Sequence, residues 1–369
     1  MELLARNVNS VWPVAVRTLR DGGHLRDSRC GRVIEYYQPV MSVYENPKER
    51  VLFDPLRDAN PFFHVFEGLW ILAGLDDVEW PSQFNKRLAS YSDDGVTFHG
   101  AYGKRLRKTS VGDQLLYAVR QLDDNPDDRR VVLTLWEAEK DLGRPSKDIP
   151  CNTHLYVKVR EEHLIVTVCN RSNDIIWGLY GANAVQWSMI QEYIAAHLRL
   201  PVGPLTTLSD SFHAYTENDT WKLFMNGGVT ICDPYEAGLV APWPLIDDPR
   251  CFDAEVQRFI KDPLDRLGPM FPNRPPCRNS FIWKVAQPLY KAWVAHRENK
   301  HGYETLQKDT TDETRKIDWI AAALAWLERR EAHDHRTIPA AHRARQARRD
   351  WTGGRATQVR GQLAKKRGR

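Results

Sequence analysis

The feature that most constrains the fold is a pair of strand-like runs joined by a short polar segment. Residues 154–159 and 164–168 are rich in β-branched and aromatic residues, and residues 160–163 connect them. A hairpin of this length brings the residues before the first run next to those after the second. It therefore places Cys151, Arg171 and Asp174 at one end of a sheet, and we expect a functional site there.

A cysteine beside an arginine is suited to nucleophilic catalysis. The reactive form of cysteine is the thiolate, and a nearby cation lowers the thiol pKa from its ordinary value of about 8.5. Arg171 is the expected cation, and Arg171 with Ser172 also makes a good phosphate-binding pair. An isolated intracellular cysteine is more often a small buried hydrophobe. The residues around Cys151 favour the catalytic interpretation.

An apolar helix with one carboxylate is the second informative feature. Asn60-Pro61 opens the helix, and its buried side is expected to consist of Phe63, Phe66, Leu69, Trp70 and Leu72. Glu67 lies inside this helix, where a carboxylate is misplaced, paired or functional. Loss of hydration there would raise its pKa.

The remaining pattern mixes helices and strands. Helices are predicted at 8–22, 112–122 and 183–200, and strands at 33–37, 40–44, 131–136 and 205–215. A proline-rich break at 241–244 precedes further helical patterns at 252–261, 280–297 and 312–332. We therefore expect a catalytic domain at 1–240, a helical extension at 241–335 and a basic, disordered tail at 336–369.

The tail raises the question of a nucleic-acid partner. The chain has a net charge of +4, and its segment 336–369 holds eleven Lys and Arg residues against Asp350 alone. Such a tail predicts weak contact with nucleic acid or a solvated segment without a partner. A nucleic-acid-binding protein is therefore the alternative from another functional class, although Trp351 is the tail's only aromatic residue able to stack on a base.

Targeting and metal signals are absent from the sequence. No apolar run approaches the roughly 20 residues of a membrane span, and the first residues do not resemble a secretory signal. The six cysteines have no CxxC spacing, so no metal site is indicated. We expect a cytoplasmic protein with no membrane contact.

Several motifs in a fixed order resemble the thymidylate synthase family. The central ones are Pro150-Cys151, Arg171-Ser172-Asn173-Asp174, Asn183 and His213-x-Tyr215. Upstream segments at 28–31, 67–74, 102–104 and 125–130 agree, so the resemblance spans roughly residues 26–232. It implies an α+β, thymidylate synthase-like fold with a large mixed β-sheet flanked by helices, and the C-terminal helices form an extension outside the family core.

The resemblance also implies a reaction. A one-carbon unit carried by 5,10-methylenetetrahydrofolate is added to C5 of a pyrimidine nucleotide after a thiolate has added to C6. Cys151 corresponds to the nucleophile, Glu67 to the residue that organises water and moves protons, and Tyr102 to the residue that assists proton removal at C5.

Binding roles follow from the same resemblance. Phosphate binding falls to Arg29, Arg171, Ser172, and the pair Arg129 and Arg130, which in the family reaches across a homodimer interface. His213 and Tyr215 correspond to sugar-binding residues, and Asp174 to the residue that holds the folate. Asn183 is the candidate reader of the base, because an amide both donates and accepts. Counting from Arg171 gives Ala182 instead, so one residue is inserted within 179–182, and both uracil and cytosine remain open.

Departures from the family pattern favour a hydroxymethylated product. Asn152 stands in place of the usual His after the nucleophile, Asn170 in place of Gln, and Asn85 in place of a Trp near the folate. The short apolar closing tail is missing. A polar Asn85 would let water, rather than hydride, reach the new carbon. We therefore predict a hydroxymethyltransferase acting on dUMP, dCMP or CMP, with thymidylate synthase as the alternative.

Overall fold

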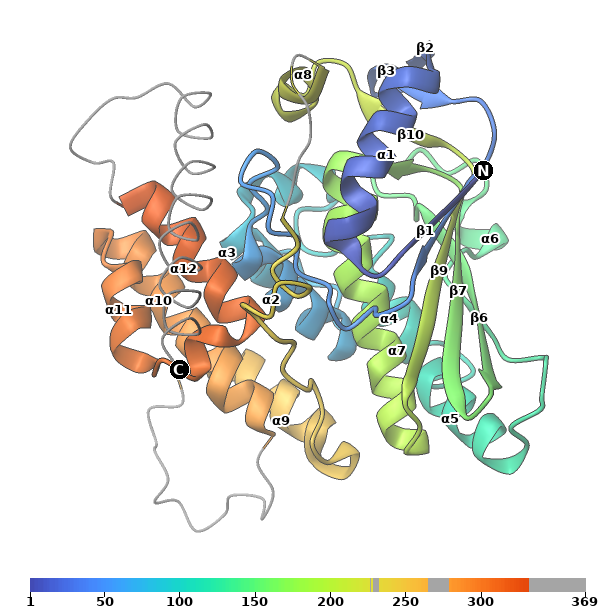
Figure 1. The fold of residues 1–369 in the computed structure, drawn as a ribbon. Helices are drawn as coiled ribbons and strands as arrows, with labels where there is room; N and C mark the ends of the chain where they lie inside the picture. Colours follow the sequence, from blue (N-terminus) through green and yellow to red (C-terminus); the bar gives the residue numbers. More distant parts are fainter. Residues whose placement is uncertain (226, 228–231, 265–278, 332–369) are drawn as a thin grey trace, which may run out of the picture.

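The computed structural model describes residues 1–225, 227, 232–264 and 279–331. Strands lie on one side of the molecule and the C-terminal helices on the other (Figure 1). The basic tail at 336–369 lies outside the described residues, so its disorder and its weak contact with nucleic acid stay predictions. No helix within the described ranges is both long and apolar enough to cross a bilayer.

The larger sheet has six strands in a mixed arrangement. Their order is β1 (Glu2–Ala5), β4 (Val40–Tyr44), β9 (Val202–Ser209), β7 (His163–Asn170), β6 (Asn152–Arg160) and β5 (Val132–Thr134). The pairs β1–β4 and β7–β9 are parallel, and the other three pairs are antiparallel. The predicted large mixed sheet is confirmed.

The β6–β7 hairpin forms where the sequence predicted it. Glu161 and Glu162 both have positive φ angles, 48° and 59°, which is the backbone of a tight hairpin turn. At the far end, Asn152 is paired with Asn170. One residue further on, the Arg171 N–H donates to the Cys151 carbonyl at 2.9 Å. The hairpin therefore brings Cys151 and Arg171 together.

A second, smaller sheet carries the other end of the site. Its strands are β2 (Gly23–Ser28), β3 (Gly31–Tyr36), β10 (Phe212–Tyr215) and β8 (Asn173–Asp174). The sequence predicted one strand over 205–215, and this prediction was wrong. The chain leaves the large sheet after Ser209 and enters the small sheet at Phe212, where β10 pairs with β8 and β3. His213 consequently lies opposite Asp174.

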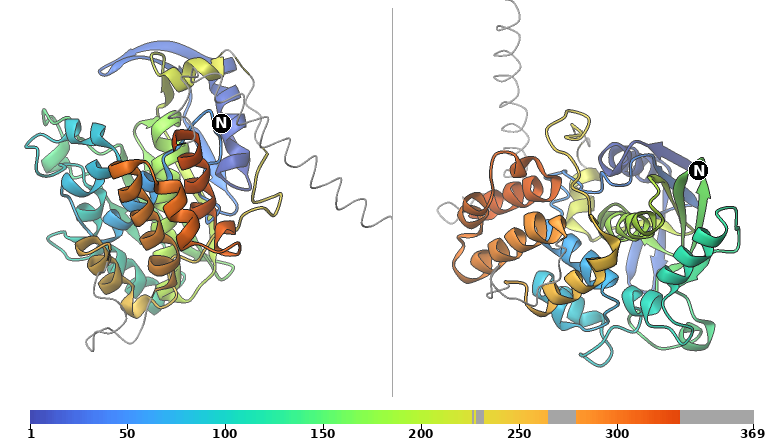
Figure 2. Two further views of the ribbon diagram at one scale, coloured as in Figure 1. Left: turned by 90° about the vertical axis from the view of Figure 1, so that its left-hand side faces the viewer. Right: turned by 90° about the horizontal axis from the view of Figure 1, so that it is seen from below.

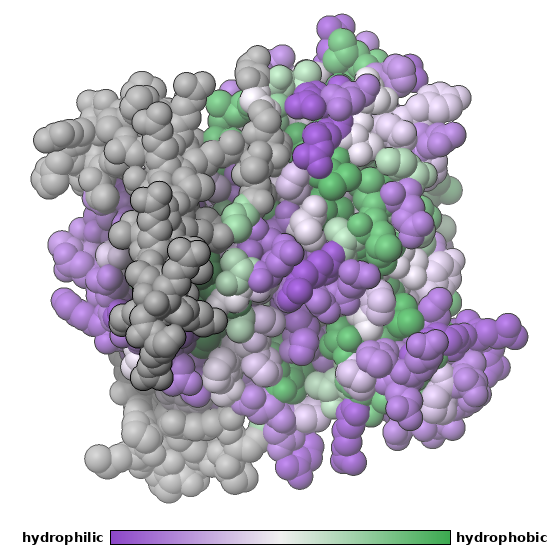
Figure 3. Space-filling model, in the orientation of Figure 1, coloured by the Kyte–Doolittle hydropathy of each residue, from purple (hydrophilic) through white to green (hydrophobic). Residues whose placement is uncertain are grey.

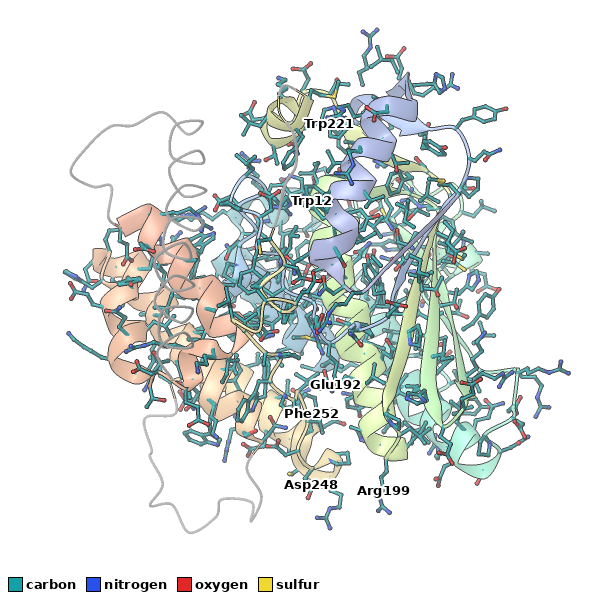
Figure 4. All side chains as sticks on the ribbon, in the orientation of Figure 1. Trp12, Glu192, Arg199, Trp221, Asp248 and Phe252 are labelled. Carbon is teal, nitrogen blue, oxygen red and sulfur yellow. The ribbon has the colours of Figure 1, made fainter. Side chains whose placement is uncertain are left out.

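Helices cover one face of the large sheet. These are α1 (Val8–Gly22), α5 (Gln114–Asp124) and α7 (Ala184–Leu198), close to the ranges predicted. Trp12 of α1 points into the core, fully buried, and packs edge-on against Tyr180 at 5.9 Å (Figure 4). Figure 3 shows hydrophobic side chains at the surface where Figure 1 places α1 and β1.

A π-helix precedes α7. It spans Ile175–Asn183, and the Asp174 carboxylate caps its start by accepting the N–H groups of Ile176 and Trp177 at 3.0 and 3.1 Å. A π-helical turn holds one residue more than an α-helical turn. The insertion that the resemblance implies within 179–182 stays a prediction, and its position falls inside this π-helix.

The apolar helix α2 (Pro61–Leu72) is enclosed on all sides. Asn60 caps it by accepting the N–H groups of Phe62 and Phe63, and Pro61 occupies its first position, as predicted. Every residue of α2 is buried except Glu67, which is half-buried. The helix therefore needs covering elements around its whole circumference.

The C-terminal helices supply part of that cover. They are α9 (Pro249–Lys261), the π-helical η3 (Ile282–Ala286), α10 (Gln287–Asn299), α11 (Gly302–Asp309) and α12 (Asp318–Glu331). α11 was not predicted from the sequence. Trp293 of α10 and Trp326 of α12 pack on Phe62 of α2 at 5.3 and 5.5 Å. The view from below in Figure 2 places α10 to α12 opposite the strands of the large sheet.

Buried polar contacts also tie the extension to the rest of the chain. Glu192 of α7, near the centre of the molecule in Figure 4, forms a buried ion pair with Arg50. The other Glu192 oxygen accepts the Leu245 N–H at 3.0 Å. The Tyr235 hydroxyl donates to Asp318 at the start of α12 at 2.7 Å. The division at residue 240 stays a prediction, but these contacts cross it.

A chain ending at Val240 is expected to lose its folded state. Without α10 and α12, Phe62 and its buried neighbours on α2 would face water, at a cost of about 25 cal/mol for each Å² of apolar surface. Circular dichroism and sedimentation measure the outcome, with a chain ending at Glu331 as the control that should stay folded. A cooperatively folded, monodisperse 1–240 fragment would contradict this expectation.

Candidate active site

A cavity of about 400 Å³ opens between α2, the π-helix and the start of β6. Five residues singled out from the sequence line it: Asn85, Glu67, Tyr102, Cys151 and Asn183. Its wall also contains apolar and aromatic side chains, namely Phe63, Trp70, Ile71, Pro81, Leu88, Tyr91, Phe98 and Trp177. The cavity is thus mostly apolar with a few convergent polar groups, the usual composition of a small-molecule site.

Cys151 directly precedes the first residue of β6, and Arg171 is its neighbour. One Arg171 Nη atom lies 3.7 Å from the Cys151 Sγ, and the guanidinium is held by hydrogen bonds to the Ile149 and Pro150 carbonyls, both 2.9 Å. Burial raises the pKa of the Cys151 thiol, and this effect outweighs the lowering by Arg171 and Arg29. The sequence predicted only the lowering. The thiol is therefore protonated in the free site, and Arg171 is placed to stabilise the thiolate once it forms.

Glu67 is the carboxylate of the cavity. One of its oxygens accepts a hydrogen bond from the Gln186 Nε2 at 2.7 Å. Burial raises the Glu67 pKa to about 7, although the bond from Gln186 acts in the opposite direction. A carboxylate with this pKa exchanges protons readily near neutral pH, which suits general acid–base catalysis.

Asn152 orients Tyr102. The Asn152 Nδ2 donates to the Tyr102 hydroxyl oxygen at 2.6 Å, and the Asn152 Oδ1 accepts from the Trp187 Nε1 at 3.1 Å. Because Trp187 is only a donor, it fixes which end of the amide faces Tyr102. Burial raises the Tyr102 pKa well above its ordinary value, so the hydroxyl keeps its proton. The unusual residue after the nucleophile thus has a structural role.

Asn183 belongs to a chain of buried polar side chains. Its Nδ2 donates to the Asn173 Oδ1 at 2.9 Å, and the Asn173 Nδ2 lies 3.0 Å from the Ser209 hydroxyl oxygen. Asn183 and Ala182 both line the cavity. Only Asn183 brings a polar group to it, with the Oδ1 and one N–H not used in the bond to Asn173.

The predicted phosphate ligands divide into two groups. Arg29 lies in the turn between β2 and β3, and its charge acts on the Cys151 thiol, while Ser172 follows Arg171 directly. Arg129 and Arg130 are exposed, precede β5 and do not line the cavity. Arg130 pairs instead with Asp128 at 2.7 Å. None of the five lines the cavity: Arg171 and the charge of Arg29 act on Cys151 at its edge, whereas among the described residues Arg129 and Arg130 show no interaction with Cys151.

The remaining predicted residues border the site without lining the cavity. His213 is buried, with its Nδ1 3.1 Å from the Ser211 hydroxyl oxygen, and its ring meets that of Tyr215 edge-on at 5.5 Å. Burial raises the Tyr215 pKa to about 12, and the Cys151 and Asp174 charges act in the same direction. Burial also raises the Asp174 pKa, against the lowering by the backbone N–H groups that it caps.

Sequence reasoning assigned no role to several side chains that line the cavity, although Asp148 belongs to the stretch 148–153 that it singled out. Gln186 and Trp177 line the cavity, and so does Asp148, whose carboxylate accepts the Gly100 N–H at 2.7 Å. The signal for Gln186 was its place three residues after Asn183, which puts both on one helical face. For Trp177 and Asp148 the signal was adjacency to the predicted motifs.

Known proteins match most of this chain. A family model described as thymidylate synthase matches residues 55–222. The deoxyuridylate hydroxymethyltransferase of Pseudomonas phage M6 is 42% identical over 339 residues, which cover 89% of this chain and 93% of that protein. The chain belongs to the thymidylate synthase family. Family membership confirms the α+β fold and makes the chain an enzyme that transfers a one-carbon unit to C5 of a pyrimidine nucleotide.

Further members of the family match shorter parts of the chain. The deoxyuridylate hydroxymethyltransferase of Bacillus phage SP01 is 39% identical over 199 residues, which are 51% of this chain and 52% of that protein. A putative thymidylate synthase of Methanothermobacter thermautotrophicus is 28% identical over 210 residues, covering 55% of this chain and 87% of its own length.

Turnover of this family member is expected to depend on pH through Glu67. Because the Glu67 pKa is about 7, the carboxylate is neutral below and ionised above this value. If the ionised form is the working base, the rate rises with pH up to about 7 and then levels off. The check is a pH–rate profile from pH 5.5 to 8.5. Glu67→Gln should abolish this rise of the rate with pH and lower the rate by about two to four orders of magnitude. If the variant's rate still rises with pH up to about 7, the titration belongs to another group.

Proposed function

We propose that this enzyme hydroxymethylates deoxyuridylate at C5. The observation that carries the proposal is the common cavity of Cys151, Glu67 and Asn85, which combines a nucleophile, a base and a polar wall. The names of the phage relatives, which are 42% and 39% identical, support the same product.

Activation of the nucleotide is assigned to Cys151. Its thiolate adds to C6 of the base, which moves electron density to C5 and makes that carbon nucleophilic. Arg171 stabilises the thiolate from 3.7 Å and, with Arg29 and Ser172, holds the phosphate. Tyr102, oriented by Asn152, assists removal of the C5 proton.

Base selection is assigned to Asn183, with His213 and Tyr215 on the sugar. While the Asn183 Nδ2 donates to Asn173, the amide presents its Oδ1 and one N–H to the cavity. Uracil has a hydrogen-bond donor at N3 and an acceptor at O4. These two groups match the Oδ1 acceptor and the neighbouring N–H donor of Asn183. Cytosine offers the reverse order, so the bond to Asn173 favours uracil.

The cavity fits a folate as the one-carbon donor. Its aromatic and aliphatic wall, with Phe63, Trp70, Leu88 and Trp177, suits a flat pteridine ring. When bound, 5,10-methylenetetrahydrofolate supplies the one-carbon unit. Asp174, whose carboxylate accepts the Trp177 N–H at 3.1 Å, is proposed to hold the pterin end.

The product is assigned from Asn85. This residue lines the cavity at the end of α3 (Glu79–Phe84), and its Oδ1 accepts the Arg87 N–H at 3.2 Å. A polar side chain there leaves water access to the carbon newly attached at C5. Water then completes the reaction, and hydride transfer from the folate is not needed.

The product experiment tests this function. With dUMP and methylenetetrahydrofolate, the enzyme should form a hydroxymethylated nucleotide by mass spectrometry and no dihydrofolate by ultraviolet absorbance. Turnover with dCMP or CMP should be weaker, and Cys151→Ala should bind dUMP without turnover. Dihydrofolate formed one-for-one with a methylated nucleotide would make the enzyme a thymidylate synthase.

A homodimer completes the proposal. The face of the large sheet opposite α1 and α7 has an uncharged row across all six strands: Leu4, Val43, Thr206, Thr167, Tyr156 and Val132. Leu4 and Val132, on the two edge strands, are 62% and 44% exposed, and Tyr156 on β6 is 46% exposed, so the row presents apolar side chains to solvent from one edge of the sheet to the other. A hollow on this face reaches Arg171. A second copy seated there would lie close enough to offer Arg129 and Arg130 to the phosphate.

Mixing two inactive variants tests the shared site. Arg130→Ala lacks the donated arginine and Cys151→Ala lacks the nucleophile, so a hybrid dimer keeps one complete site. Random subunit exchange should restore about a quarter of wild-type activity. Hybrids identified by mass spectrometry that remain inactive would place Arg130 in its own subunit's site, and an active Arg130→Ala variant would place it outside catalysis.

A further inference from the structure

We propose that Gln186 is a catalytic residue that holds, together with Glu67, the water molecule that becomes the hydroxyl group of the product. This inference rests on the proposed hydroxymethylation. It assigns a task to a side chain that neither the sequence motifs nor the resemblance singled out.

The Gln186 amide is divided between two partners. The side chain is 4% exposed and lines the cavity with Glu67 and Cys151. Its Nε2 donates to a Glu67 oxygen at 2.7 Å. Its Oε1 is enclosed and accepts no hydrogen bond from any residue in the described part of the chain. Buried amide oxygens are nearly always paired, so this one calls for a donor from outside the chain.

Water is the donor that fits. The bond to Glu67 fixes the amide, because only the nitrogen end donates, and so the Oε1 is a fixed acceptor. A bound water needs at least two polar partners. Gln186 offers one acceptor and the second Glu67 oxygen another. A water donating both hydrogens to these oxygens would direct its lone pairs into the cavity, towards the carbon attached at C5.

The step balances without an oxidant or a reductant. The water oxygen forms a bond to the exocyclic methylene carbon at C5, and one water proton goes to the Glu67 carboxylate. The π electrons of the methylene move to the C4 carbonyl oxygen. They then return to form the C5–C6 double bond and expel the Cys151 thiolate. Gln186 keeps its bond to the remaining hydroxyl hydrogen throughout.

Gln191 provides a matched control on the same helix. It is also a buried glutamine of α7, and its Oε1 accepts no hydrogen bond from the described residues. However, its Nε2 donates to the Leu164 and Gly203 carbonyls, at 2.8 and 2.9 Å, and it does not line the cavity. A change at Gln191 tests what disturbance of α7 does on its own.

The experiment makes a small thiol compete with water for the methylene. The full-length enzyme and its Gln186→Met, Gln186→Glu and Gln191→Leu variants receive dUMP, methylenetetrahydrofolate and 2-mercaptoethanol. Tritium release from C5 reports the steps before water attack, and mass spectrometry gives the ratio of thioether to hydroxymethyl product. Circular dichroism verifies that each variant is folded.

The expected result is a changed product ratio with early steps retained. Gln186→Met has a similar length but no acceptor for the water, so the ratio of thioether to hydroxymethyl product should rise about tenfold, as expected for the loss of one hydrogen bond. Gln186→Glu keeps an oxygen at this position and, with one proton shared between the two carboxylates, a donor to Glu67, so its ratio should change less than that of Gln186→Met. Gln191→Leu should also keep that ratio.

Three results would overturn the inference. A parallel fall of tritium release and hydroxymethylation in Gln186→Met, at an unchanged ratio, would make Gln186 a support for Glu67 only. An equal shift in Gln191→Leu would attribute the effect to α7. A shift in Gln186→Glu as large as in Gln186→Met would exclude the oxygen as the cause. By contrast, methylated nucleotide and dihydrofolate from the wild-type enzyme would overturn the proposed function itself.

Discussion

The burial of α2 is the constraint on which the rest of the structure depends. A helix that is apolar around its whole circumference must be enclosed by other elements. On one side α7 approaches so closely that a side chain at Gly68 would collide with the Met189 sulfur. On another, Trp293 and Trp326 of the C-terminal helices cover Phe62. The same enclosure removes water from Glu67 and raises its pKa, so the packing that stabilises the fold also prepares the base.

Uncharged amides organise the cavity. Asn152 orients Tyr102, Asn183 is fixed by Asn173, and Gln186 is bonded to Glu67. An amide both donates and accepts, and it adds no charge whose burial would need compensation. The amides therefore orient their partners without adding a charge of their own to the cavity. Glu67 and Cys151 keep protonation behaviour governed mainly by burial.

The sequence predicted what depends on local pattern. The β6–β7 hairpin and α2 follow from periodicity and turn residues, and the cavity contains Cys151, Glu67 and Tyr102 as the motifs indicated. The break between β9 and β10 was missed because residues 205–215 keep one extended pattern while the chain changes sheets. The contact of Gln186 with Glu67 joins two helices far apart in the sequence. The net rise of the Cys151 pKa depends on burial, which no motif encodes.

The π-helix before α7 gives the family a route to new specificity that needs no substitution at the site. One residue more or less in a helix rotates everything on one side of the change by about 100° relative to the other. Between Ile175 and Asn183 such a change would exchange Asn183 for Ala182 at the wall of the cavity, because both already line it. A single-codon insertion or deletion could thus replace an amide by a methyl group while the sheets and α7 stay in place. An alignment that places this gap elsewhere would pair the wrong residues at this wall of the cavity.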